Sequence, residues 1–238
     1  MAKILLDIGA HTGESLEESL RAIYSFDSIL AIEPSSKCIP SLYKFKDKRI
    51  HIYQFAVSNY DGWNTLYGAG SVGGSLFGDK KQYWKRSETV KVVKLFEFIM
   101  ACSKPGDDLY IKVNIEGSEI HIIEELKLIK NRQIISVLLS IDIDKVPSLK
   151  KHKSKFQEKI NKIPFPIVVR NEKNNQLAVR NWLMKTDILI PIPRLKQIID
   201  SCRLFLPLQR NLLRIIKLYV PKKIWLYIAR RFGPNHAR

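Results

Sequence analysis

The chain has 238 residues, of which 45% are hydrophobic and 26% charged, so it can bury one good core. The cysteines lie far apart and form neither a metal-binding pattern nor a disulfide framework, which favours a reducing compartment. No apolar run approaches the roughly 20 residues that span a bilayer, and the start of the chain shows no secretory signal. We therefore expect a cytoplasmic protein.

The formal net charge of +17 is distributed unevenly. Residues 1–144 hold 18 Lys and Arg against 19 Asp and Glu, whereas residues 145–238 hold 22 against 4. Such asymmetry indicates an anionic partner for the C-terminal part: nucleic acid, membrane headgroups or an acidic substrate. The alternative is a basic surface that is simply well solvated.

In chain order, Lys3–Ile8 is an apolar run typical of a buried parallel strand, and a helical pattern with early glutamates follows it. Ser28–Ile32 and residues 50–57 predict the second and third strands. Further strands are predicted at 63–67, 90–93, 109–115 and 134–143, with helices at 95–101 and 119–128. Strands and helices that alternate in this way predict an α/β fold with a mostly parallel sheet covered on both faces. Residues 164–170 and 177–182 predict a terminal antiparallel pair.

Prolines punctuate the last part of the chain, and we place a domain boundary near Pro191. Residues 1–190 then form the α/β domain and residues 191–238 a helical extension. Residues 194–232 combine apolar stripes, basic side chains and interface-seeking aromatics, which is typical of helices lying on an anionic membrane. Packing on the core or a homodimer contact are the alternatives, with nucleic acid the least favoured partner.

The turn after the first strand, DIGAHTG, matches neither of two common phosphate-binding patterns. A P-loop needs Gly-Lys-Ser/Thr, but Glu14 follows Gly13. The dinucleotide pattern G-x-G-x-x-G has His11 and Glu14 where its second and third glycines belong. An acid at the strand end, Asp7, and a second acid after the next strand, Glu33, fit the ammonium group and ribose of S-adenosylmethionine better. The alternative is a plain strand–helix turn with a capping acid.

Four motifs occur in order: DIGAHTG, AIEP, AVSNYDG and IKVNIEGSE. Together they resemble the FkbM family of S-adenosylmethionine-dependent methyltransferases, over roughly residues 3–144, and IKVNIEGSE is the most specific. The resemblance implies a Rossmann-like class I methyltransferase fold and methylation of an oxygen, often a sugar or natural-product hydroxyl.

The resemblance also implies site residues. The methionine end of the cofactor would be lined by Asp7, Gly9, His11 and Gly13. Glu33 would hold the ribose, and Ala56, Val57 and Ser58 would border the adenine. The methyl group would be transferred beside Lys112, Asn114, Glu116 and Glu119. Asn114 departs from the family pattern, which usually has Asp there, so it would position a ligand and not act as a base.

Alternation along the strand puts Lys112, Asn114 and Glu116 on one face. Three polar residues on a buried strand need partners or a function. Glu116, at the carboxyl end, is our candidate base, and the alternative is a Lys112–Glu116 ion pair that only braces the sheet. Asp142 and Asp144 point to the same edge and suggest a divalent cation with Glu116, but their spacing is not diagnostic, so we assign no metal ligand.

Five of the eleven glycines fall within residues 68–78, which predicts a mobile substrate loop or lid, or else a slack surface connection. His11 is expected to contact the cofactor and His121 to pack or face solvent. The sequence thus predicts an S-adenosylmethionine-dependent O-methyltransferase acting on a sugar hydroxyl of a glycan or glycolipid. The alternatives are a nucleic-acid methyltransferase, a catalytically silent binding or membrane scaffold, and an oxidoreductase, which the glycine spacing disfavours.

Overall fold

The computed structural model describes residues 1–21, 24–81, 85–130 and 133–187. The chain divides into two compact units, Met1–Trp182 and Leu183–Arg238. The predicted boundary near Pro191 and the helices predicted within 194–232 lie outside the described residues, so membrane contact and dimerisation stay predictions. Within the described residues, no helix is both long and apolar enough to cross a membrane.

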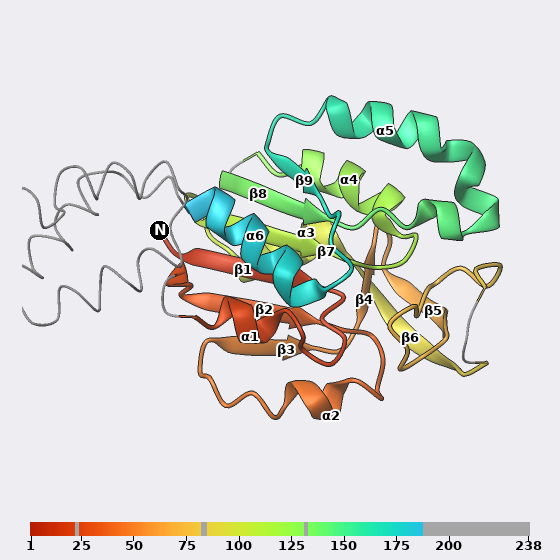
Figure 1. The fold of residues 1–238 in the computed structure, drawn as a ribbon, viewed down its shortest axis with the longest axis horizontal. Helices are drawn as coiled ribbons and strands as arrows, with labels where there is room; N and C mark the ends of the chain where they lie inside the picture. The colour runs from red at the N-terminus through yellow and green to blue at the C-terminus, as the bar shows by residue number, and fades with distance from the viewer. Residues whose placement is uncertain (22–23, 82–84, 131–132, 188–238) are drawn as a thin grey trace, which may run out of the picture. The chain divides into compact units, whose positions relative to one another are not determined.

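The main sheet has six strands in the order β3-β2-β1-β7-β8-β9, and every neighbouring pair is parallel (Figure 1). Its strands are β1 (Lys3–Ile8), β2 (Ser28–Ile32), β3 (Ile50–Tyr53), β7 (Asp108–Val113), β8 (Gln133–Leu139) and β9 (Ile167–Val169). The order reverses between β1 and β7, as in doubly wound Rossmann-like folds. The predicted α/β Rossmann-like fold is confirmed, and ligands of such sheets bind beyond the carboxyl ends at this reversal.

A second sheet has the order β4-β6-β5, with β4 parallel and β5 antiparallel to β6. Its strands are β4 (Ala56–Ser58), β5 (Gly62–Tyr67) and β6 (Ser87–Lys94). The single strand predicted at 50–57 is therefore two strands, because the chain leaves the main sheet after β3. Figure 1 shows this small sheet beyond the arrowheads of the main sheet, next to the predicted ligand edge.

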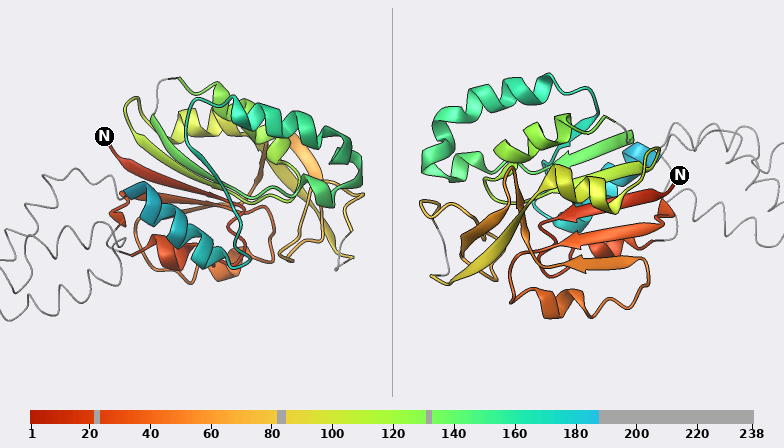
Figure 2. Two further views of the ribbon diagram at one scale, coloured as in Figure 1. Left: turned by 45° about the horizontal axis from the view of Figure 1, so that its top comes forward. Right: turned by 180° about the vertical axis from the view of Figure 1, so that it is seen from behind.

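Helices cover both faces of the main sheet (Figure 2). On one face lie α3 (Leu95–Cys102), α4 (Glu119–Lys127) and α5 (Lys153–Asn161), and on the other lie α1 (Leu16–Ser19), α2 (Ile39–Leu42) and the start of α6 (Asn175–Asp187). Alternation along β1 explains the layering: Ile4, Leu6 and Ile8 join the buried cluster under α3 and α4, while Leu5 and Asp7 face the other side. Two 3₁₀ turns, Ile143–Lys145 and Pro147–His152, precede α5.

The predicted terminal antiparallel pair is wrong. β9 pairs parallel with β8, and residues 177–182 belong to helix α6. Ala178, Val179 and Trp182 are buried at helical spacing, and Trp182 Nε1 donates a 2.9 Å hydrogen bond to Ser136 Oγ of β8. Asn174 Oδ1 accepts from Leu177 N at 2.9 Å, which caps the helix where the sequence suggested a hairpin turn.

Two strands are also shorter than predicted. β7 ends at Val113 and β8 at Leu139, so Asn114, Glu116 and Asp142 lie in loops at the carboxyl edge. Glu116 has a φ of 53°, which is a left-handed conformation and not strand. The expectation that Lys112, Asn114 and Glu116 share one strand face is therefore wrong for Glu116.

Candidate active site

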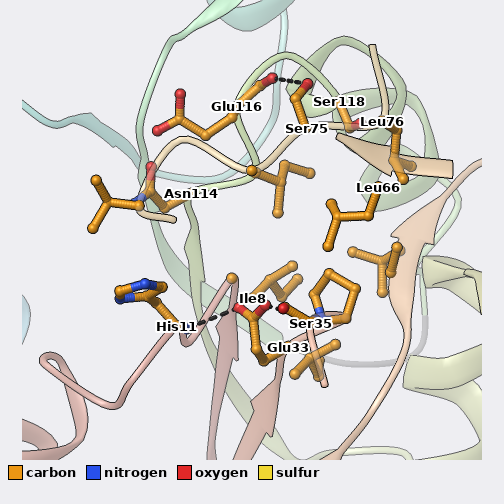
Figure 3. A pocket seen from close by; sticks show the side chains of 18 of the residues that line it. Ile8, His11, Glu33, Ser35, Leu66, Ser75, Leu76, Asn114, Glu116 and Ser118 are labelled. Atoms are coloured by element: carbon orange, nitrogen blue, oxygen red, sulfur yellow. Dashed lines mark hydrogen bonds between the residues drawn. The ribbon is translucent and has the colours of Figure 1, made fainter. Parts of the chain in front are cut away.

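A cavity lies at the point where the strand order reverses, beyond the carboxyl ends of β1, β2 and β7. The small sheet and the connection after β5 close its other side. Its walls are formed by Ile8, Gly9, His11, Ile32, Glu33, Pro34, Ser35, Phe55, Ala56, Val57, Leu66, Gly70, Ser71, Val72, Gly74, Ser75, Leu76, Asn114, Ile115, Glu116, Ser118 and Asn175. Figure 3 shows His11, Glu33 and Ser35 on one side and Asn114, Glu116 and Ser75 on the other.

The glycine turn brings two loop backbones into contact. Gly9 has a φ of 77°, and a Cβ placed on it would lie 2.0 Å from the Asn114 carbonyl oxygen. A side chain at Gly9 would therefore force the β1 and β7 loops apart. Gly13 has a φ of 98° and packs on the Phe45 ring, outside the cavity walls. Gly9 thus borders the cavity as expected, whereas Gly13 shapes the turn.

The backbone N–H groups of the turn are used within the protein. Gly9 and Ala10 donate to the Ile32 carbonyl oxygen at 2.9 and 3.0 Å. His11 N donates to Glu33 Oε2 at 2.9 Å, and Gly13 N donates to the Ala10 oxygen at 2.9 Å. A phosphate-binding turn points free backbone N–H groups at the ligand. Because these four N–H groups already donate within the protein, they do not form a phosphate site.

Asp7 and Lys112 form a buried ion pair beneath the turn. They are register partners on the adjacent strands β1 and β7, with Asp7 Oδ1 and Lys112 Nζ 2.8 Å apart. Lys112 Nζ also donates to the Gly9 carbonyl oxygen at 2.6 Å, and Ser15 Oγ donates to Asp7 Oδ2. Neither side chain borders the cavity. Asp7 and Lys112 therefore hold the glycine turn, and their side chains lie outside the cavity walls where the sequence predicted ligand contact.

Glu33 borders the cavity at the end of β2. Its two carboxylate oxygens accept from His11 N and Ser35 N, each at 2.9 Å (Figure 3). Burial raises the pKa of Glu33, while these backbone donors and the nearby His11 and Lys112 charges oppose that rise. Because a carboxylate has about four acceptor positions, two stay free for a ligand.

His11 stands at the edge of the cavity with a left-handed φ of 51°. Its Nδ1 lies 2.7 Å from Glu14 Oε1. Contact with the Cys38 side chain and with Glu14 raises the pKa of His11 to about 10. Glu14, the first of the glutamates that follow the glycine turn, is thus paired within the protein.

Of the three residues expected beside the adenine, Ala56 and Val57 line the cavity and Ser58 does not. Ser58 is the last residue of β4, and its Oγ donates to Asn59 Oδ1 at 3.3 Å. With Ile32, Phe55 and Leu66, the two β4 residues form an apolar wall.

Glu116, the candidate base, is buried and lies between two lysines. Its Oε2 is 2.8 Å from Lys80 Nζ and 3.5 Å from Lys145 Nζ. The alternative of a Lys112–Glu116 brace is wrong in its partners, since Lys112 pairs with Asp7. Asn114 borders the same part of the cavity, where its amide can donate and accept hydrogen bonds.

The acidic residues expected to support a cation are paired with lysines. Asp142 Oδ1 is 2.6 Å from Lys145 Nζ, and Asp144 Oδ2 is 2.6 Å from Lys153 Nζ. Within the described part of the chain, no group of three metal-ligating side chains converges.

Behind Glu116, Glu119 is fully buried and does not line the cavity. Its Oε2 accepts from Gly117 N at 2.8 Å. Burial, reinforced by Asp142 and Glu116, raises the pKa of Glu119 to about 8. His121 stacks on Phe77 with ring centroids 6.4 Å apart, so it packs as expected.

Sequence reasoning missed several residues at the site. Ser35 follows AIEP directly, so the motif itself could have indicated it. Asn175 begins α6, which the sequence suggested was a hairpin turn. Lys80 reaches Glu116 from 36 residues earlier in the chain, and no local pattern announces that contact.

Comparison with known proteins adds little. No family model matches the chain, and no curated protein is significantly similar to it. A solved structure of methyltransferase FkbM from Methylobacillus flagellatus KT matches with 14% identity and a TM-score of 0.38. The match covers 78% of this chain but only 37% of that chain, and it bears the name of the family that the sequence motifs resemble. A likeness of this degree says nothing about activity.

Proposed function

We propose that the chain is an S-adenosylmethionine-dependent O-methyltransferase. The observation that carries the proposal is the glycine turn beside Glu33. The four turn amides described above are bonded internally, while the Glu33 carboxylate borders the cavity with free acceptor positions. This combination suits a ligand with a ribose diol and no phosphate in contact with the turn.

The remaining walls fit the other parts of this cofactor. The apolar wall of Ile32, Phe55, Val57 and Leu66 suits a flat base. Gly9 lets the backbone approach the ligand closely, and Asn114 offers an amide near the reacting end. When bound, S-adenosylmethionine supplies an activated methyl group, so the protein's task is to orient the reactants and exclude water.

On the acceptor side, the chain contributes Asn114 and Glu116. A hydroxyl that accepts a methyl group loses its proton, and Glu116 is the carboxylate that borders the cavity there. The FkbM resemblance makes a sugar hydroxyl of a glycan or glycolipid the acceptor we propose. The proposed compartment is the cytoplasm.

The test is calorimetric titration of the full chain with S-adenosylhomocysteine. We expect binding by the wild type and a loss of about 10- to 100-fold in affinity for Glu33→Ala, since a hydrogen bond to a charged group contributes about 1.5–3 kcal/mol. Glu33→Gln, which keeps one oxygen acceptor, should bind with intermediate affinity.

Glu158→Ala is the matched control. Glu158 is exposed on α5 and, among the residues that the structure describes, forms an ion pair with Lys162 alone, at 2.6 Å, so its removal should leave the affinity unchanged. A wild type that takes up no S-adenosylhomocysteine at millimolar concentration would overturn the proposal. Tight binding of a nicotinamide dinucleotide instead would favour the oxidoreductase alternative.

Two observations favour a second candidate, a catalytically silent binding protein. Asn114 replaces the expected acid, and Glu116 is held by two lysines. A silent protein would bind S-adenosylhomocysteine with the same dependence on Glu33 but would transfer no methyl group from S-adenosylmethionine to any of a panel of sugar acceptors.

A further inference from the structure

The long connection that follows β5 forms one wall of the cavity. Residues 68–80 contribute Gly70, Ser71, Val72, Gly74, Ser75 and Leu76 to it. The start of this connection is ordered by an isolated bridge, in which Tyr67 N donates to the Ser75 oxygen at 2.8 Å and Ser75 N to the Tyr67 oxygen at 2.9 Å. The connection is therefore a built part of the site and not a slack surface loop.

Polar contacts fasten this segment across the cavity to the turn after β7. Ser75 Oγ donates to the Glu116 carbonyl oxygen at 2.7 Å (Figure 3), and Lys80 Nζ lies 2.8 Å from Glu116 Oε2. Asp79 Oδ2 accepts from Ser148 N at 2.6 Å in the neighbouring 3₁₀ turn. Lys80 Nζ also donates to the Gly73 oxygen, so the same ammonium group contacts both Glu116 and the segment's own backbone.

The segment makes a small number of apolar contacts. Ala69 and Leu76 pack with the buried cluster of the small sheet, and Phe77 packs against the main core and stacks on His121. Five glycines lie within it, and Val72 is 71% exposed although it borders the cavity. A buried ion pair fixes geometry but adds little net stability, because desolvation offsets most of the attraction between the charges. Segments with few buried apolar contacts open locally far more often than the whole domain unfolds.

Glu116, the residue to which Ser75 and Lys80 bond, is also the candidate base. Glu116 keeps a left-handed φ, a conformation that persists only where neighbours hold it. Two of those neighbours, Ser75 and Lys80, come from the segment, so opening the segment would release both the Glu116 backbone and its carboxylate. Lys145, at 3.5 Å, would remain.

We propose that residues 68–80 are a lid over the cavity and that Lys80 latches this lid onto Glu116. Lys80 is then a positioning residue, because it orients the Glu116 carboxylate only while the lid is closed. The part played by Glu116 in methyl transfer rests on the proposed function, whereas the latch itself does not.

The test is amide hydrogen exchange, followed by mass spectrometry, on the full chain. Lys80→Met and Glu116→Gln should each speed exchange within residues 68–80 by about tenfold. The double variant should exchange no faster than Lys80→Met alone, since Lys80→Met already removes the contact with Glu116 together with the bond to the Gly73 oxygen. Lys80→Arg, which keeps the charge, should restore most of the protection.

Lys162→Met is the matched control. It removes an exposed lysine that is also paired with a glutamate, Glu158, and should leave exchange in residues 68–80 unchanged. Unchanged exchange in Lys80→Met, additive effects in the double variant, or an equal rise across β1 and β7 would each overturn the latch.

S-adenosylhomocysteine serves as the probe for closure over a ligand, and it should slow exchange of residues 68–80 in the wild type. If it does not bind at all, the proposed function fails. The exchange rates of the variants measured without ligand still test the Lys80–Glu116 latch. If it binds without slowing exchange of the segment, the proposed function stands and the lid is wrong.

Discussion

Two buried lysine–carboxylate pairs flank the cavity, and they differ in what holds their backbones. Lys112–Asp7 and Lys80–Glu116 both have nitrogen–oxygen distances of 2.8 Å and similar burial. The first pair joins two adjacent strands in the middle of the main sheet. The second joins a glycine-rich connection to a loop residue in a left-handed conformation.

The comparison teaches that distance and burial alone do not reveal what an ion pair does. Both strands of the first pair are fixed by backbone hydrogen bonds, so its charges cannot separate without unfolding the sheet. In the second pair one partner lies on a glycine-rich connection between two strands, so we expect its charges to separate by local opening of that connection. We therefore expect the first pair to set global stability and the second to set local opening.

The largest expected difference comes from Lys112→Met. It leaves the fully buried Asp7 without a counter-charge, and breaking such a pair costs about 3–5 kcal/mol. Lys80→Met should lower the free energy of unfolding by much less, because Glu116 keeps Lys145 as a counter-charge and, on the proposed lid, can gain water by local opening. Urea unfolding of both variants measures this difference. Equal losses would remove the distinction between the two pairs.

A smaller difference is expected between glycines of the two regions. Gly9→Ala combines a left-handed φ with a Cβ 2.0 Å from the Asn114 oxygen, so it should destabilise the fold by about 2–4 kcal/mol. Gly74→Ala, in the lid, meets nothing closer than 3.4 Å and should change stability by less than about 0.5 kcal/mol. Thermal unfolding of the two variants tests this, and a destabilised Gly74→Ala would show that the lid is packed as tightly as the turn.

The smallest expected effect concerns Glu119, which lies behind Glu116. Its folded-state pKa of about 8 exceeds its ordinary 4.5, so the folded protein holds a proton that the unfolded chain releases between those values. The free energy of unfolding should therefore fall as pH rises from about 4.5 to about 8. Glu119→Gln, which has no proton to release, should flatten that fall and make the protein more stable than the wild type at pH 8. Unfolding curves between about pH 5 and pH 9 measure this, and parallel profiles for variant and wild type would contradict it.

The sequence correctly predicted the main strands and the sheet edge at which the site lies, because both depend on local sequence patterns. Apolar runs bounded by turns fixed the strands, and parallel strands bring their carboxyl ends to one edge. Gly9, Glu33, Asn114 and Glu116 therefore meet at one cavity, as expected. The same logic failed for residues 177–182, where apolar residues at helical spacing were interpreted as a strand.

Contacts across the chain could not be predicted in the same way. Lys112 faces Asp7 because of the register between β1 and β7, which neither strand's own sequence reveals. Lys80 meets Glu116 because the glycine-rich connection folds back over the cavity, a path that its composition permits but does not specify. This pairing makes Asp7 and Lys112 a support for the glycine turn, where the sequence predicted ligand contact.

The approach of Gly9 to the Asn114 carbonyl oxygen bears on how this site can diversify. At this contact backbone packs directly on backbone, and there is no room for a side chain at Gly9. Natural variation can reshape the acceptor pocket more readily from the lid and from the start of α6, which present side chains to the cavity on connections that tolerate change. Homologues that differ in acceptor should therefore vary most in those two segments and least in the glycine turn.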